Sequence, residues 1–396
     1  MRLPASTFRA LLYLLTLFLC PSLSIRAADE ATAVACLSPQ QAREYKLDAT
    51  FFRKCLLAEE ILIATSEHVS DFTILEAAYQ FRMVMKTVTP EVARRIRDQK
   101  VLCVLLAHNE LTSRVPLFAT DKTGKELDFY NWRQRGFLTT VDDRQVVLFA
   151  EEDVMEYAGG MQNESILIHE FGHVIQGAGF DKELNDRVKE AFRNAKDKGR
   201  YQDGYAAQRF RRVKSPTPVS LIDALVKSFP VETRDFFADC LTGGDILING
   251  KPAPSHAEVT RDDSVLIVFG GPKQCYAAVN AGEYWAEGVQ DWYDTNRTMD
   301  HDHNHIYTRH QLKTYDPELA DLCSEVLGDT EWRFVSPRTR AGTGHLIGYD
   351  LTTSPTVQKL EHIDLAAQDY YDTYWHDYWQ RLHEKHIAHA SPKPSQ

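Results

Sequence analysis

The chain has 396 residues, of which 43% are hydrophobic and 26% are charged. These values are ordinary for a globular protein, and the length allows one elaborate domain or two modest ones. The formal net charge of −11 argues against a nucleic-acid partner, because an acidic surface repels phosphates.

Residues 1–28 have the layout of a secretory signal peptide. An apolar run from Ala10 to Cys20 follows two arginines, and small residues separate it from the first acidic residue, Asp29. The run is about half as long as a bilayer-spanning helix, and no later segment could replace it. We therefore expect the mature chain to be secreted or periplasmic and not stably inserted in a membrane. Without the signal the formal charge changes from −11 to −14, because three arginines and no acid are lost.

Six cysteines remain after the signal, an even number in a chain that we expect to be exported. In an oxidising compartment this number favours disulfides over metal thiolates, and no CxxC pair indicates a metal site. The connectivity is open, with Cys36–Cys55 as a first guess. The six residues are Cys36, Cys55, Cys103, Cys240, Cys275 and Cys323.

The pattern of apolar residues along the chain predicts a mixture of helices and strands. Residues 29–100 are mainly helical, and the charge-dense stretch 181–215 predicts a solvated helix and loop. Asn249 and Gly250 predict a tight turn, and the aromatic, histidine-rich end predicts a packed helix with a frayed tail. The expected strands are Ile61–Thr65, Val101–Ala107, Val146–Val154 and Val265–Gly271.

The stretch from Glu164 to Gly179, ESILIHEFGHVIQGAG, contains the pattern HExxH. His169 and His173 are four residues apart, so on a helix they lie one turn apart on one face and can both bind one zinc ion. Glu170 is offset around the helix, where a carboxylate can accept a proton from a metal-bound water. Asn163 or Ser165 can cap the helix start. The alternative is a buried helix that contains two histidines by chance.

Zinc needs a third protein ligand, and two downstream stretches offer one. ETRDFFADC places Asp235 one helical turn before a second aspartate, and AGEYWAEG places Glu283 one turn before Glu287. In each pair the first carboxylate can bind the metal, and the second can hold a ligand histidine through its free N–H. The residues alone leave Asp235 and Glu283 open as alternatives.

HEFGH followed by EYWAE resembles the gluzincin metallopeptidases of the anthrax lethal factor type, and further segments between Phe51 and Trp332 resemble a secreted bacterial subgroup with that peptidase core. The resemblance implies an α+β, zincin-like fold with an HExxH active-site helix, a mixed sheet and a helical N-terminal part. It also implies that Glu283 is the third zinc ligand. In that family a tyrosine seven residues earlier stabilises the transition state, and here that residue is Tyr276.

The same resemblance suggests a division of the chain. A mainly helical N-terminal part, residues 29–100, precedes a zincin-like catalytic domain, residues 101–335, and a C-terminal helical extension with a tail, residues 336–396. The 110 residues from His173 to Glu283 exceed the usual gap, so we expect an insertion at about 181–272. The strand Val146–Val154 is expected at the sheet edge beside the cleft.

The roles of two further groups of residues are left open by the sequence. His301, His303 and His305 lie on one side of an extended chain and could bind a second metal, although a polar loop is the simpler interpretation. Arg133 and Arg135 precede the active-site helix and could meet a substrate carboxylate or pair with acidic neighbours.

The residues and the resemblance together predict a secreted endopeptidase with one Zn²⁺ per chain and a protein or peptide substrate. The alternatives are a zinc hydrolase of non-peptide amides or cell-envelope material, and a binding protein without turnover on the same fold. The sequence leaves the cleavage specificity and the oligomeric state open.

Overall fold

The computed structural model describes residues 33–210 and 213–390, so the expected signal peptide lies outside the described residues. Helices and strands are mixed along this part of the chain, and its largest sheet has both parallel and antiparallel neighbours. The expectation of a mixed α+β chain with a mixed sheet is therefore confirmed. Within these two ranges no helix is long and apolar enough to cross a membrane.

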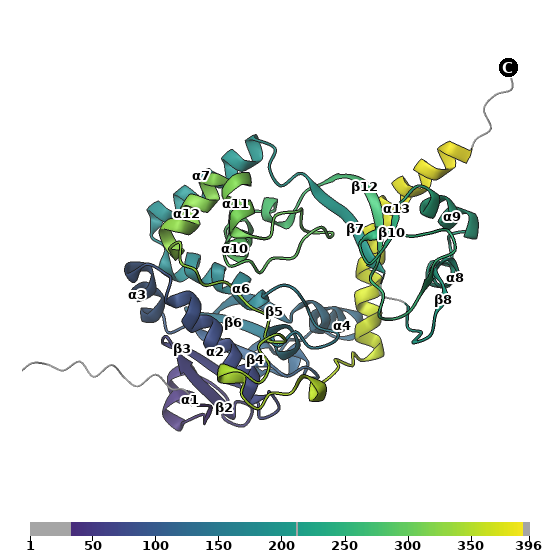
Figure 1. Cartoon of the computed structure of the whole chain (residues 1–396). Coiled ribbons are helices and arrows are strands. Elements are labelled where there is room, and N and C mark those ends of the chain that lie inside the picture. Colours follow the sequence, from purple (N-terminus) through teal and green to yellow (C-terminus); the bar gives the residue numbers. More distant parts are fainter. Residues whose placement is uncertain (1–32, 211–212, 391–396) are drawn as a thin grey trace, which may run out of the picture. The chain divides into compact units, whose positions relative to one another are not determined.

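The largest sheet has six strands in the order β1-β2-β3-β4-β6-β5 (Figure 1). Strands β3, β4 and β6 run parallel, whereas β1, β2 and β5 are antiparallel to their neighbours. Every residue of β3 and β4 is buried, as expected for central strands that are covered on both faces. The strands are β1 (Ala35–Cys36), β2 (Lys54–Ala58), β3 (Ile61–Thr65), β4 (Leu102–Leu106), β5 (Gly136–Val141) and β6 (Arg144–Ala150).

This sheet corrects two expectations about the region before the HExxH motif. The strand expected at Val146–Val154 ends at Ala150, and Glu151–Val154 form the short helix α5. This strand, β6, pairs with β4 and β5, so it is internal, and the edge strand is β5. Strand β5 was not expected, because none of its residues is fully buried and its apolar pattern is therefore weak.

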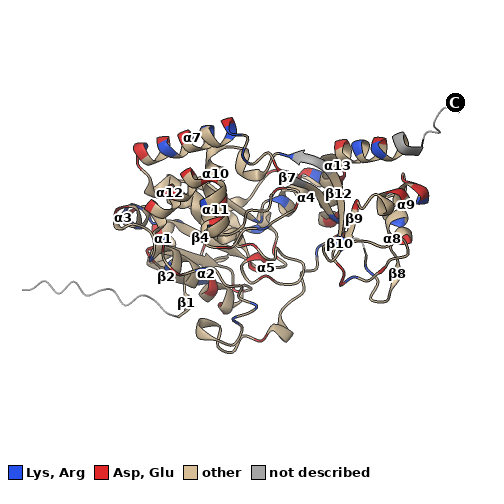
Figure 2. Cartoon of the chain, turned by 45° about the horizontal axis from the view of Figure 1, so that its top comes forward, with Lys and Arg blue, Asp and Glu red and all other residues tan. Residues whose placement is uncertain are grey.

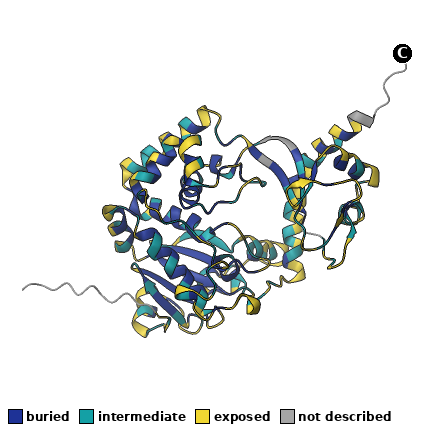
Figure 3. Ribbon diagram, viewed as in Figure 1, coloured by how far each residue is buried: buried dark blue, intermediate teal, exposed yellow. Residues whose placement is uncertain are grey.

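Helices α2, α3, α6, α10 and α12 share one hydrophobic core with a face of the six-stranded sheet. Phe171 of α6 packs edge-on against Phe81 of α2, with ring centroids 4.9 Å apart. Figure 3 shows this sheet and α10 as largely buried. The helices on and around this core are α1 (Pro39–Tyr45), α2 (Asp71–Met85), α3 (Pro90–Asp98), α4 (Gly124–Arg133), α6 (Ile166–Val174), α10 (Ala281–Trp292), α11 (Arg309–Tyr315) and α12 (Pro317–Leu327).

The solvated helix expected after the HExxH motif is α7 (Lys182–Asp197). Only Val188, Ala191 and Ala195 of this helix are buried, and charged residues line its outer face (Figure 2). The structure therefore agrees with the charge pattern of this segment, although the loop after it also contains a strand that was not expected.

That strand, β7 (Gly204–Phe210), belongs to a second sheet of four strands in the order β10-β9-β12-β7. The expected strand at 265–271 is β12 (Val265–Lys273), and β9 and β10 are joined at Asn249 and Gly250, both with positive φ, as the turn signal predicted. Much of the expected insertion therefore has a fold of its own. The remaining strands are β8 (Val219–Ser220), β9 (Ile246–Ile248), β10 (Lys251–Pro252) and β11 (Glu258–Val259).

A second hydrophobic core joins this sheet to α8 (Leu221–Ser228), α9 (Arg234–Thr242) and α13 (Glu361–Ala390). Helix α13 is the helix expected near the C-terminus, and Trp375 on it stacks on Phe269 of β12 with centroids 4.8 Å apart. Helix α13 is thus packed on the four-stranded sheet and on α8 and α9.

The expectation of disulfides is wrong for the described residues, because all six cysteines are free. Five of them are buried, and Cys36 alone is exposed. Cys36 and Cys55 lie on neighbouring strands, but Cys55 pairs with Ala35 and Cys36 pairs with Lys54. This offset of one residue directs the two side chains to opposite faces of the sheet, since side chains alternate along a strand.

Candidate metal centre

The HExxH motif lies on α6, which begins directly after Ser165. Of the two expected capping residues, Ser165 is the one that caps the helix, and its hydroxyl oxygen accepts a hydrogen bond from the Ile168 N–H at 3.2 Å. The same hydroxyl donates to Gln80 on α2 at 2.8 Å. The helix start is therefore held both locally and by a neighbouring helix.

His169, His173 and Glu283 come together on two packed helices, α6 and α10. The Nε2 atoms of both histidines lie 3.1 Å from the same oxygen, Oε2 of Glu283. One atom of each residue that could bind a metal, an imidazole nitrogen or a carboxylate oxygen, lies within 4.8 Å of the corresponding atoms of the other two. Two imidazoles and a carboxylate are a donor set suited to zinc, and three protein ligands leave one position open.

The close approach of α6 and α10 depends on Gly172. A Cβ atom at this position would lie 3.2 Å from Cα of Ala286 and 3.4 Å from Cβ of Val289. The Trp285 indole N–H donates to the Gly172 carbonyl at 2.9 Å, and Asn280 caps the start of α10. These contacts place Glu283, in the first turn of α10, opposite the two histidines.

Buried polar side chains contact the ring nitrogen of His169 that faces away from Glu283, and they fix the orientation of the ring. Its Nδ1 atom lies 2.7 Å from Oε1 of Gln290 and 3.3 Å from Oε1 of Glu287. An Nδ1–H donor there leaves Nε2 as the atom that faces His173 and Glu283. Glu287 also contacts His303 at 3.2 Å. Glu287 was expected in this position, but Gln290 was not; the only sign of it in the sequence is its place seven residues after Glu283, two helical turns along α10.

Burial and ion pairing act against each other on the pKa values of these groups. Burial alone would raise the pKa of Glu283, but hydrogen bonds from His169 and His173 outweigh it and bring the pKa to about 2. Burial also opposes ionisation of Glu287, yet the charge of His303 and hydrogen bonds from both histidines hold its pKa well below the usual range. Both carboxylates are therefore anionic at neutral pH.

Glu170 and Tyr276 lie beside the three converging residues. The Tyr276 hydroxyl donates to Oε1 of Glu283 at 3.2 Å, while Glu283 uses its other oxygen toward the histidines. Burial raises the pKa of Tyr276, and the Glu283 carboxylate raises it further. Burial also raises the pKa of Glu170, against the lowering effect of the His169 and His173 charges.

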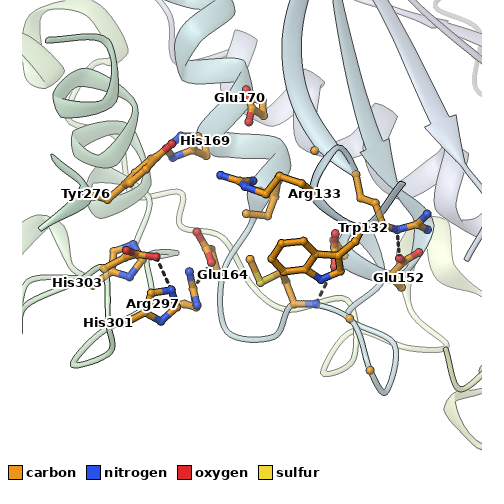
Figure 4. Close-up of a pocket in the computed structure, with 18 of the residues that line it drawn as sticks. Trp132, Arg133, Glu152, Glu164, His169, Glu170, Tyr276, Arg297, His301 and His303 are labelled. Carbon is orange, nitrogen blue, oxygen red and sulfur yellow. Dashed lines mark hydrogen bonds and ion pairs between the residues drawn. The ribbon is translucent and has the colours of Figure 1, made fainter. Parts of the chain in front are cut away.

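Two cavities meet at these side chains. One has a volume of about 260 Å³ and reaches Trp132, His301 and Tyr370; the other, of about 600 Å³, reaches Phe137 and His173. Figure 4 shows the smaller cavity, with Glu170, His169 and Tyr276 on one side of it. The residues that line both cavities are Arg133, Gly136, Glu170 and Tyr276.

The alternative third ligand, Asp235, does not reach the histidines. It is exposed on α9, a helix whose buried residues belong to the second core. The neighbouring Phe236 and Phe237 are buried, but the aspartate is exposed to solvent. Buried aromatic neighbours in the sequence were therefore a misleading indicator for this carboxylate.

The three histidines of the segment 301–305 do not converge. His303 is buried between Asp300 and Glu287, His301 lies 2.7 Å from Asp302, and His305 is exposed. No metal-ligand group that combines these histidines occurs within residues 33–210 and 213–390. The interpretation as a polar loop near the cleft fits this placement better than a second metal site.

A second cluster of ligand-type atoms was not expected from the sequence. Cys240, Asp245 and His386 are buried, and one atom of each lies within 4.8 Å of the others. The Lys385 ammonium donates to both oxygens of Asp245, at 2.7 and 2.9 Å, and His386 contacts the same carboxylate. Lys385 already balances the charge of Asp245, so this cluster works as a polar link between α13 and the C-terminal end of α9.

Comparison of the chain with known protein families, with curated protein sequences and with solved structures finds no match.

Proposed function

We propose that this protein is an exported zinc metallopeptidase with a zincin-like fold, similar to the gluzincins of the lethal factor type. The observation that carries the proposal is the convergence of His169 and His173 on one oxygen of Glu283, across 110 residues of chain. A chance HExxH pattern needs no ligand at that point, whereas a zinc site needs a third ligand, and a carboxylate can serve as one.

In this proposal His169, His173 and Glu283 hold one zinc ion, and Glu287 and Gln290 keep His169 in its binding orientation. Zinc supplies Lewis acidity at such a site. Glu170 accepts the proton of the attacking water and returns it to the leaving amine. The Tyr276 hydroxyl donates a hydrogen bond to the oxygen on which negative charge develops.

Edge strand β5 supports a peptide as the substrate. One side of β5 pairs with β6, and the other side has no strand partner in its sheet. Phe137 and Leu138 of β5 line the larger cavity together with His173 and Glu283. An extended peptide can add to such an edge through main-chain hydrogen bonds, which would place its backbone beside the metal ligands.

The test measures zinc content and peptide hydrolysis on the purified mature chain. We expect one zinc per wild-type chain and loss of zinc in Glu283→Ala. Glu170→Gln should keep the zinc but lower peptide hydrolysis by about 100-fold or more, because only the proton acceptor is removed. Asp235→Ala is the matched control and should keep both zinc and activity.

Two results would contradict this proposal. If the wild type holds no zinc even after zinc is added back, the helix is a packed element without a metal. If Glu170→Gln hydrolyses peptides as fast as the wild type, Glu170 has no role in the reaction. A wild type that binds zinc but cleaves no peptide in a broad mixture would instead favour a non-peptide substrate or a binding function.

A further inference from the structure

Arg133 lies at the junction of the two cavities. It is one of four residues that line both, and two of the others are Glu170 and Tyr276, the groups that the proposed mechanism uses for chemistry. Figure 4 shows its side chain extending toward His169 and Tyr276. The positive charge of Arg133 therefore faces the place where a scissile bond would lie.

Arg135, two residues later, has a different role. Its guanidinium donates to Glu152 at 2.6 Å and to the Glu110 carbonyl at 2.8 Å. These bonds anchor the segment between α4 and β5 to the body of the sheet. Arg133 is exposed, and no hydrogen bond or ion pair joins it to any other residue in the described part of the chain. Of the two arginines, only Arg133 has a guanidinium available to a ligand.

Most acidic side chains of the smaller cavity already have close partners. Glu164 accepts from Gln290 at 3.1 Å and pairs with Arg297. Asp302 contacts His301 at 2.7 Å, and Asp153 accepts from the Met161 N–H at 2.7 Å. Glu152 and Glu287 are held by Arg135 and His303. These acidic side chains are thus bound to their own donors, and Arg133 pairs with none of them.

We propose that Arg133 binds a carboxylate of the substrate close to the scissile bond. This inference rests on the proposed peptidase function and adds a specificity to it. A guanidinium binds a carboxylate through two parallel N–H···O bonds, which a neutral amide cannot match. The carboxylate can come from an acidic side chain or from the free C-terminus of the peptide, and the experiment distinguishes the two sources.

Aromatic rings beside Arg133 offer an apolar surface for the residue that carries the carboxylate. Trp132 precedes Arg133 in α4, and its ring lies 5.2 Å from Tyr370 and 5.6 Å from Tyr371 of α13 between centroids. All three rings line the smaller cavity. The preferred ligand is therefore a peptide with a carboxylate. The carboxylate pairs with Arg133, and the apolar part of the residue that carries it packs on the aromatic rings.

The experiment measures binding of intact peptides to the zinc-loaded Glu170→Gln protein by calorimetry. Three N-acetylated, alanine-based hexapeptides serve as probes. The first has a central glutamate and an amidated C-terminus, the second has a central glutamine and an amidated C-terminus, and the third has a central glutamine and a free carboxylate. We expect the first or the third to bind roughly tenfold more tightly than the second.

This preference should disappear when Arg133→Gln is added, and it should weaken with rising salt because the pair is charged. Arg193→Gln is the matched control, since Arg193 is exposed on α7 outside both cavities, and it should keep the preference. An equal loss of affinity for all three peptides in Arg133→Gln would overturn the inference. A preference that survives in Arg133→Gln would overturn it as well.

Binding to Glu170→Gln separates this inference from the proposed function. If the preference depends on Arg133 but the wild type hydrolyses no peptide, the carboxylate site stands and the peptidase proposal fails. If the wild type hydrolyses the neutral and acidic peptides equally well and Glu170→Gln binds them equally, the peptidase proposal stands and the role of Arg133 fails.

Discussion

His169 makes the most contacts of the three residues that converge at the candidate metal centre. One ring nitrogen faces Glu283, and the other faces Gln290 and Glu287. Gln290 is fully buried, and its amide group donates to Glu164 and to the Ser165 carbonyl. The amide oxygen is thereby directed at His169, which makes Gln290 a positioning residue for the histidine.

We expect Gln290→Leu to weaken zinc binding by roughly 10- to 100-fold, because His169 loses the partner that fixes its tautomer and ring orientation. The zinc dissociation constant is measured by competition with a chelator, with Gln99→Leu, an exposed position outside the site, as the control. An unchanged dissociation constant in Gln290→Leu would show that Glu287 alone is sufficient to hold the histidine.

At the scale of elements, the site depends on how closely α6 and α10 approach. Gly172 permits this contact, and the Trp285 indole joins the two helices through the Gly172 carbonyl. Helix α10 is buried on both of its sides, since Gly288 faces Leu319 of α12. Helix α10 therefore cannot move away from α6 without disturbing its packing on α12.

We expect Gly172→Val to destabilise the fold by about 1–3 kcal/mol and to weaken zinc binding more than tenfold, because the added methyl groups push α10 and Glu283 away. Gly288→Ala is a control on the other side of the same helix, where the three atoms nearest to the added Cβ all belong to the Leu319 side chain. It should lower the free energy of unfolding, measured in urea, with a smaller effect on zinc. Equal losses of zinc affinity in both variants would contradict this account.

At the scale of the whole molecule, hydrophobic cores rather than covalent cross-links hold the described part of the chain together. The largest core lies between the six-stranded sheet and its helices, and another core joins the four-stranded sheet to α13. A chain of this length can bury enough apolar surface to be stable without disulfides. Burial raises the pKa of the Cys103 and Cys323 thiols well above the usual range, so these thiols stay protonated and unreactive.

We therefore expect the folded mature chain to react with a thiol reagent such as DTNB at Cys36 alone, the one exposed cysteine, and at all six cysteines after denaturation. Reducing agent should leave the melting temperature unchanged, because no cross-link constrains the unfolded chain. Fewer than six reactive thiols in denaturant, or a melting temperature that falls with reductant, would show that disulfides are present.

Local features were predictable from the sequence because they depend on interactions over a few residues. Four-residue spacing on a helix brings His169 and His173 to one face, Ser165 can cap only the helix that follows it, and an Asn-Gly pair favours a tight hairpin turn. Buried central strands such as β3 and β4 also appear as short apolar runs. These signals predicted the candidate metal helix and three strands of the mixed sheet, β3, β4 and β6, but not β1, β2 or β5.

Tertiary structure alone decided which distant side chains meet. Glu283 and Asp235 have the same local spacing to a second carboxylate. Of the two helices that carry them, α10 packs on α6 and α9 does not, so only Glu283 reaches the histidines. The edge strand, the separation of Arg133 from Arg135 and the unpaired cysteines likewise follow from strand order and burial. Packing between helices and strands depends on how the side chains of a whole helix or sheet face fit together, and no short sequence pattern encodes this fit.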